Sequence, residues 1–523
     1  MAAVLRQNDS SLLANSVSAV GWSRQNATHL VRRTTFGAMK RDVDAALADG
    51  SASAAANRIV DAAAAVPLPD RPAWYADLGT GSDTERIYAL QRLWFEEMRS
   101  GGLREKMALF WHNHFVTQWP TYSGKSDVSA ARLAWDYLEL IRKHAMGNFR
   151  VLLHDMGLNP AMLYYLDGYI NTSGAANENY AREVMELFTM GQFDEDGQPN
   201  YAETDIKQIA RALTGWMVTS KAAASFNPAL HDEGTKSFLG QTGNFGYDDV
   251  VDALIETRAN QIAWFICKKL YCYFVQAEPD DTVIDSLAAT FIASDWEIAP
   301  VLKKLFSSDA FYSSTLIAAR IKSPVEYLIG CVRECEITPT TELYEYIRVS
   351  LTPERLNQEL LNPPNVAGWP GLNPPGSDGA PGQRSWLTTG TLPDRWNMAE
   401  QLIYGYGATN FDPVDLGRKI SDPSNPYLLP TDLAHVMLAV PLSVAGIRDV
   451  EAPFGGDPMA PPPQAFLDGP AYSVSLCKIM LDGMAHYEWP VFSEKGSEED
   501  EAARTLLRAY LTYLVELPAY QLT

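Results

Sequence analysis

Apolar residues recur at intervals of three and four along most of the chain, which is the periodicity of a helix that buries one face. Residues 85–100 show the pattern clearly, because Ile87, Leu90, Trp94 and Met98 fall on one side of a helical wheel. Similar stripes cover residues 126–146, 177–190, 203–216, 259–275, 280–294, 321–335 and 499–515. The pattern therefore predicts an all-α fold, built as a large multi-helix bundle.

Strand-like alternation of apolar and polar residues is rare in this chain. The best candidate is one short β-hairpin, whose strands are predicted at residues 224–230 and 235–239, with a turn through the sequence HDEG between them. Proline and glycine are dense in residues 362–383, and again in 421–430 and 452–465. Long helices are excluded there, and Pro/Gly-rich loops are expected instead.

The loop-rich stretches predict an organisation in four parts. These are an N-terminal segment (1–20), a main helical domain (21–361), a loop-rich connector with a helix (362–430) and a set of C-terminal helices (431–523). Trp369 lies within the connector, and a large aromatic residue favours packing on the protein over a free linker.

The chain is strongly acidic. Its 64 acidic and 42 basic residues give a formal net charge of −22. This charge repels phosphate backbones and anionic membrane surfaces, so nucleic acid is not an expected partner. No long apolar run is present, and neither a transmembrane helix nor a secretory signal peptide is predicted. The five cysteines lack CxxC spacing and are predicted to be buried thiols.

Two histidines stand two residues apart in WHNHFVT, residues 111–117. Two residues of a helix span about 200°, so His112 and His114 point to different sides and cannot bind one metal ion together. His114 falls on the apolar face beside Met107 and Phe110. It is predicted to point inward, either as a core histidine with a hydrogen-bonding partner or as a general base or single metal ligand.

A polar face is predicted on the helix within NENYAREVMELFTMG, which Asn177 begins as N-cap and Gly191 ends. Its members are Glu178, Asn179, Arg182, Glu183, Glu186 and Thr189. The face is either solvated, with Glu–Arg pairs four residues apart, or it lines an internal cleft. In the cleft its carboxylates would act as acid/base groups or as ligands of a hard cation, which the excess of negative charge favours.

Two further groups of polar residues are candidates for chemistry. Asp205 stands in the first turn of its predicted helix, where it either caps the helix or orients an inward histidine such as His114. His231, Asp232 and Lys236 cluster at the predicted hairpin, where they either form an ordinary turn or reach over a cleft.

Seven segments, taken in chain order, resemble a known bacterial family. They are THLVRRTTFGA (28–38), KMALFWHNHFVT (106–117), NENYAREVMELFTMGQ (177–192), YAETDIKQIARALTGW (201–216), HDEGTKSFLG (231–240), ARIKSPVEYLIG (319–330) and NPPNVAGWPG (362–371). On these segments the chain is identified as a member of the family called domain of unknown function 1800. The resemblance implies no settled activity.

The resemblance also carries expectations about location and partners. Members are commonly exported, so a periplasmic or extracellular location is implied, with the cytoplasm as the alternative because no signal peptide is predicted here. Their genes often lie beside those of a sulfatase-like family with twin-arginine export signals. A sulfatase-like protein from a neighbouring gene is therefore an expected partner.

Two functions are compatible with these residues. The first is an acid/base or metal-assisted enzyme that hydrolyses or modifies a glycan or another polar polymer in a helical cleft, around a divalent cation if a metal takes part. Its binding partner would be this polymer or a small-molecule substrate. Its catalytic residues would be His114, Glu183, Glu186, Asp205 and His231, and its substrate contacts Arg32, Asn179, Arg182, Asp232 and Lys236. The alternative for Arg32 is a structural pair with one of the many acidic residues. The second is a non-catalytic binding and assembly partner of the sulfatase-like protein. Zinc protease, serine hydrolase and nucleotide-binding motifs are missing.

Overall fold

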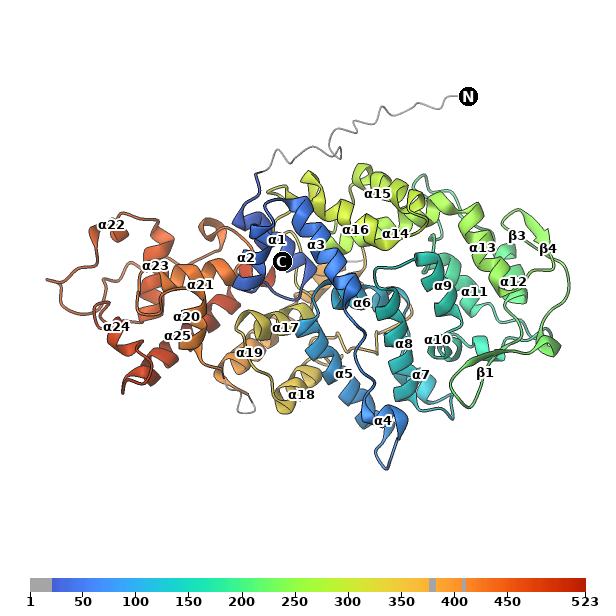
Figure 1. Ribbon diagram of the computed structural model, residues 1–523, viewed down its shortest axis with the longest axis horizontal. Coiled ribbons are helices and arrows are strands. Elements are labelled where there is room, and N and C mark those ends of the chain that lie inside the picture. The colour runs from blue at the N-terminus through green and yellow to red at the C-terminus, as the bar shows by residue number, and fades with distance from the viewer. Residues whose placement is uncertain (1–20, 376–381, 407–410) are drawn as a thin grey trace, which may run out of the picture.

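The computed structural model describes residues 21–375, 382–406 and 411–523. Within these ranges the chain forms 25 α-helices and two small antiparallel hairpins, so the predicted all-α fold with a short β-hairpin is confirmed. Figure 1 shows an elongated molecule, with helices α20 to α25 at one end and the hairpins at the other. In the described ranges, no helix is both long and apolar enough to cross a bilayer.

The helices before the hairpins are α1 (Arg24–Thr34), α2 (Lys40–Ala48), α3 (Ala52–Ala65), α4 (Ala73–Ala76), α5 (Asp83–Ser100), α6 (Leu103–His114), α7 (Trp119–Ser123), α8 (Ala130–His144), α9 (Phe149–Gly157), α10 (Pro160–Tyr165), α11 (Asn179–Glu186) and α12 (Glu203–Ala212). The strands are β1 (Trp216–Val218), β2 (Ala224–Phe226), β3 (Lys236–Phe238) and β4 (Gln241–Gly243).

The helices after the hairpins are α13 (Tyr247–Thr257), α14 (Ala259–Phe274), α15 (Asp281–Ala293), α16 (Ile298–Ser307), α17 (Pro324–Glu334), α18 (Thr341–Ser350), α19 (Thr391–Tyr404), α20 (Pro413–Ile420), α21 (Leu429–Met437), α22 (Gln464–Leu467), α23 (Ala471–Leu481), α24 (Trp489–Phe492) and α25 (Asp500–Glu516). All eight segments predicted from apolar stripes contain a helix, and the five cysteines are buried free thiols, as predicted.

The predicted pairing of residues 224–230 with 235–239 is wrong. Strand β2 pairs with β1, and β3 pairs with β4, so the chain makes two hairpins joined by the HDEG sequence. Pro228 begins a short 3-10 turn that ends β2, because proline has no N–H to continue a ladder. Leu239 and Gly240 both have positive φ, 51° and 82°, which suits the two-residue turn that closes β3 onto β4.

Helix α6 lies at the centre of the main body, and all of its residues are buried. Its polar side chains therefore need partners inside the protein. Lys106 forms a buried ion pair with Glu326 of α17, and Arg320 lies 3.9 Å from the same carboxylate. Nearby, Arg32 of α1 pairs with Glu334 at 2.6 Å. This buried ionic network connects α1, α6 and α17, which are far apart in the sequence.

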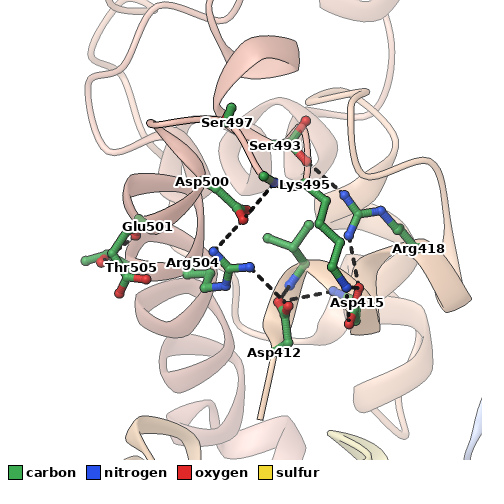
Figure 2. Close-up of polar contacts among 12 residues, drawn as sticks. Asp412, Asp415, Arg418, Ser493, Lys495, Ser497, Asp500, Glu501, Arg504 and Thr505 are labelled. Atoms are coloured by element: carbon green, nitrogen blue, oxygen red, sulfur yellow. Dashed lines mark hydrogen bonds and ion pairs between the residues drawn. The ribbon is translucent and has the colours of Figure 1, made fainter. Parts of the chain in front are cut away.

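Helix α25 is the centre of the C-terminal part, where it packs against α19, α20, α21, α23 and α24. Partly exposed ion pairs connect it to its neighbours (Figure 2). Arg504 lies 2.6 Å from Asp500 in the same helix and 3.2 Å from Asp412, which caps α20. Asp415 of α20 pairs with Lys495 at 2.9 Å. Such pairs contribute at most about 1 kcal/mol each, so apolar packing holds this part together.

Candidate functional site

The His114 side chain is buried, as predicted, and both of its ring nitrogens have partners within the protein. Nε2 lies 3.0 Å from the Phe188 carbonyl, which can only accept, so Nε2 carries the proton. Nδ1 accepts from Nζ of Lys269 at 3.1 Å. Burial, followed by the Lys269 charge, lowers the pKa of His114 well below its ordinary value. The ring is therefore a neutral imidazole at physiological pH.

Helix α11 explains why these partners meet. The helix ends at Glu186, so the carbonyls of Leu187 and Phe188, which follow it, take no part in its hydrogen bonds and need other partners. His114 binds the Phe188 carbonyl, and Lys269 donates to the Leu187 carbonyl at 3.3 Å. Burial lowers the pKa of Lys269 to about 7. The buried polar group below α11 is thus a connection between α6, α11 and α14.

Lys269 is a residue that the sequence analysis missed. A signal for it exists, because Lys269 stands four residues after Phe265 within the apolar run of α14. Its ammonium lies 4.9 Å from the centre of the Phe265 ring. A lysine at such a position extends either to the surface or to a buried acceptor, and only the tertiary structure decides between them.

His112 is also buried, so the prediction of one inward histidine on α6 requires a correction. Its Nδ1 lies 2.8 Å from the Tyr137 hydroxyl, and its Nε2 accepts from the Leu361 backbone N–H at 3.0 Å. The two rings do point to different sides of α6, as the helical geometry requires. Both sides are inside the protein, because other segments surround α6 completely.

Asp205 is fully occupied as a capping residue, and the predicted His114–Asp205 pair is not formed. Its Oδ2 accepts from the Ala202 N–H at 2.8 Å, at the start of α12. Its Oδ1 accepts from the Leu239 N–H at 3.0 Å, in the turn between β3 and β4. The carboxylate therefore joins the start of α12 to the second hairpin.

The polar face of α11 is half-buried to exposed, and most of it is paired, whereas Thr189 lies beyond the end of the helix and is buried. Arg182 lies 3.3 Å from Glu178, which is the predicted pair four residues apart, and 2.8 Å from Glu203 of α12. Glu186 accepts from the Tyr201 hydroxyl at 3.2 Å. Asn179 is exposed at the start of the helix. These contacts connect α11 to α12 and the segment before it.

Glu183 differs from its neighbours on α11. Within the described ranges its carboxylate accepts no hydrogen bond from another side chain or from the backbone. Burial raises its pKa, and the nearby Glu186 carboxylate raises it further. The Glu183 charge also adds to burial in raising the pKa of Tyr165 to about 12. A carboxyl group that has a raised pKa and no hydrogen-bonding partner within the protein is suited to donate a proton to a substrate.

The hairpins bring three predicted residues into one group. His231 Nδ1 lies 2.9 Å from the Thr214 carbonyl, and Lys236 Nζ lies 3.5 Å from His231 Nε2. Asp232 accepts two bonds from Arg211 of α12, at 2.7 and 3.0 Å. Burial lowers the pKa of Lys236. The prediction that these residues cluster agrees with this geometry, but neither His231 nor Lys236 contacts His114.

The ten predicted site residues thus occupy four separate places. His114 is below α11; Asn179, Arg182, Glu183 and Glu186 are on α11; Asp205, His231, Asp232 and Lys236 are around α12 and the hairpins; Arg32 is in the buried ionic network. Of the two alternatives for Arg32, the structure agrees with pairing to an acidic residue, because its guanidinium is buried against Glu334. Sequence spacings of two and four residues could not predict these four locations, because the partners of each group come from segments far away in the sequence.

The described part of the chain contains no group of three His, Cys, Asp or Glu side chains placed to hold a metal ion. The described part of the chain also has clefts at its surface, and four of the best defined ones are lined by none of the ten predicted residues. One cleft of about 600 Å³ lies between α1 and α21. Another, of about 680 Å³, lies between α4, α8 and the turn from β1 to β2.

Comparison with known proteins gives one match. The sequence model of the family described as "Protein of unknown function (DUF1800)" matches residues 29–522, which is nearly the whole chain. No curated protein and no solved structure matches the chain.

Proposed function

The chain belongs to the DUF1800 family, and we propose that it is a non-catalytic binding and assembly protein. The observation that carries the proposal is that the polar atoms of several candidate residues are hydrogen-bonded within the protein. Both ring nitrogens of His114 and both carboxylate oxygens of Asp205 and Asp232 bind other parts of the chain. An acid/base catalyst needs an atom that is free to reach the substrate.

The expected partner is a sulfatase-like protein encoded by a neighbouring gene, in the periplasm or outside the cell. This part of the proposal rests on the family resemblance, because no feature of the sequence or of the fold identifies the partner. A binding protein of this kind requires a rigid fold. The buried hydrogen-bonded groups around α6 and α12 are suited to fix the positions of neighbouring helices.

Co-expression of the chain with the neighbouring gene product tests the proposal. We expect the two proteins to co-elute from a sizing column and to stay together at physiological salt. The His114→Ala variant should melt at a lower temperature while its folded fraction still forms the complex. If the products elute separately at micromolar concentrations, assembly with this partner is refuted.

A second function is favoured by one residue. Glu183 has a raised pKa and a free carboxylate, and Glu186 is three residues away on the same face of α11. We propose as the alternative that Glu183 donates a proton in the cleavage of a glycan or another polar polymer. The Glu183→Gln variant should then lose most of the release of reducing ends from a polysaccharide panel, while Glu178→Gln keeps it. A wild-type protein that releases none contradicts this alternative.

A further inference from the structure

A cationic cleft lies between α4, α8 and the turn that joins β1 to β2. Its volume is about 680 Å³. The charged and polar residues that line it are Arg71, Tyr75, Arg132, Asp136, Ser220 and Lys221. Its remaining lining is small and apolar, with alanines from both α4 and the β1–β2 turn. Segments far apart in the sequence therefore build one opening on the surface.

Arg132 gives the cleft a positive charge that has no carboxylate within ion-pair distance among the described residues. Its Nε donates to the Tyr75 carbonyl at 2.7 Å, and its Nη2 donates to the Ala76 carbonyl at 3.0 Å. Both acceptors are neutral, and Arg132 makes no ion pair in the ranges that the structure describes. The guanidinium is held in a fixed position by these two bonds. A fixed guanidinium binds carboxylate or sulfate with little loss of side-chain entropy.

Lys221 adds a second free charge from the opposite wall. It is exposed in the β1–β2 turn, and its ammonium has no ionic partner among the described residues. The positions of Arg132 and Lys221 on two different walls allow one ligand to contact both. Since the chain as a whole has a net charge of −22, a local excess of cations here is not a general property of its surface.

The other charged residues of the cleft are balanced within the fold. Arg71 lies 2.6 Å from Glu139 and stands over the Tyr75 ring at 4.4 Å. Asp136 accepts from the Tyr75 hydroxyl at 2.6 Å, and burial raises the pKa of Asp136. These contacts hold the α4 wall against α8. The Asp136 carboxylate interacts with both Arg71 and Arg132 and offsets part of their charge. Three cations against one acid still line the cleft, and of these cations Arg132 and Lys221 make no ion pair within the described ranges.

We propose that this cleft binds an acidic polysaccharide through its carboxylate or sulfate groups, with Arg132 and Lys221 as the main contacts. Charged donors of this kind make strong bonds to such groups. The small apolar residues in the lining suit the apolar faces of sugar rings, and the volume of about 680 Å³ exceeds what one small anion needs. The net charge of −22 repels a phosphate polymer and an acidic polysaccharide alike, so the contacts inside the cleft must discriminate between the two. The proposal concerns a site beyond the assembly function and does not depend on it.

Affinity electrophoresis of the full chain tests the site, with polygalacturonate as the carboxylated probe and dextran sulfate as the sulfated one. Neutral dextran and single-stranded DNA are the comparison probes. We expect binding to at least one acidic polysaccharide at about 0.15 M salt, where exposed long-range attraction is screened. The more strongly bound probe identifies the anionic group. Equal retardation by dextran or by DNA overturns the proposal, as does binding to neither acidic probe.

Charge-matched variants locate the binding. Lys221→Glu should weaken it at least about tenfold, because a charge-assisted contact becomes a repulsion. Lys207→Glu on α12 changes the net charge equally and should leave binding within about twofold of wild type. Arg132→Gln should also weaken binding, with a control melting curve because Arg132 supports the α4 wall. Equal loss in Lys207→Glu and Lys221→Glu overturns the proposal. Complex formation with the sulfatase-like protein is measured separately, so either proposal can fail alone.

Discussion

Two histidines of this chain have the same kind of environment. The ring of His114 donates to the Phe188 carbonyl and accepts from Lys269, and the ring of His231 donates to the Thr214 carbonyl and accepts from Lys236. In each case an imidazole connects a backbone carbonyl to a lysine whose pKa is lowered by burial. His114 and His231 are residue types that often take part in catalysis, but in this structure their rings connect separate segments of the chain through hydrogen bonds.

The lowered pKa of Lys269 predicts a specific dependence of stability on pH. Its folded pKa is about 7, whereas a lysine in an unfolded chain keeps its proton to about pH 10.4. Between these values the unfolded state binds more protons, so the free energy of unfolding rises with pH. Lys269→Met should show a shallower rise than wild type in urea titrations. Lys268→Met, its neighbour on α14, should keep the wild-type slope. Equal slopes for wild type and Lys269→Met contradict the assignment.

The secondary-structure elements show which parts of the fold can be predicted from local sequence. Apolar stripes predicted the positions of α5, α14 and α15 well, because one apolar face of each packs on the core. They could not predict that α6 is buried on every side, since this depends on the segments that surround it. The hairpin was placed in nearly the right region with the wrong partners. Pro228 and the turn at Gly240 determine the pairing of the strands. A prediction from the alternation of apolar and polar residues does not include these two features.

The candidate site was less predictable than the fold for a related reason. Residues close in sequence, such as His231, Asp232 and Lys236, were correctly grouped. The pairing of His114 with Asp205 joined residues from different helices, and each found a closer partner in Lys269 or Leu239. Helical wheels give the direction of a side chain but not the identity of the element that it meets.

Asp205 offers a test of how α12 and the second hairpin are joined. Asp205→Ala removes the acceptors of both the Ala202 and the Leu239 N–H groups. We expect the free energy of unfolding to fall by about 1–3 kcal/mol, since a lost cap and an unsatisfied amide add together. Amide exchange at Leu239 should become faster. Ala substitution of the exposed Glu354 is the control and should change stability by less than about 0.5 kcal/mol. Unchanged Leu239 exchange would show that the amide finds another acceptor.

On the scale of the whole molecule, the main body and the C-terminal part differ in how deeply their ion pairs are buried. The main body encloses the buried ionic network, in which Glu326 meets Lys106 and Arg320. In the C-terminal part, Asp415 and Lys495 form an ion pair at the surface, whereas Arg504 and Asp500 form one that is mostly buried (Figure 2). The chain end connects the two, because the Thr523 N–H donates to the Arg320 carbonyl at 2.8 Å. A change inside the network should therefore affect the whole fold, and a change in the surface pairs should not.

Glu326→Ala and Asp415→Ala compare the two kinds of ion pair directly. Burial alone would raise the pKa of Glu326, but Lys106 and Arg320 hold it well below its ordinary value. Its stabilising contribution is therefore present above the unfolded pKa of about 4.3 and is lost as pH falls below that. At neutral pH, Glu326→Ala leaves buried cations uncompensated and should cost about 3–5 kcal/mol. Asp415→Ala should cost at most about 1 kcal/mol, and less at high salt. The difference between Glu326→Ala and wild type should narrow in acid. Equal losses in the two variants at neutral pH would mean that the buried network does not stabilise the fold more than a surface pair does.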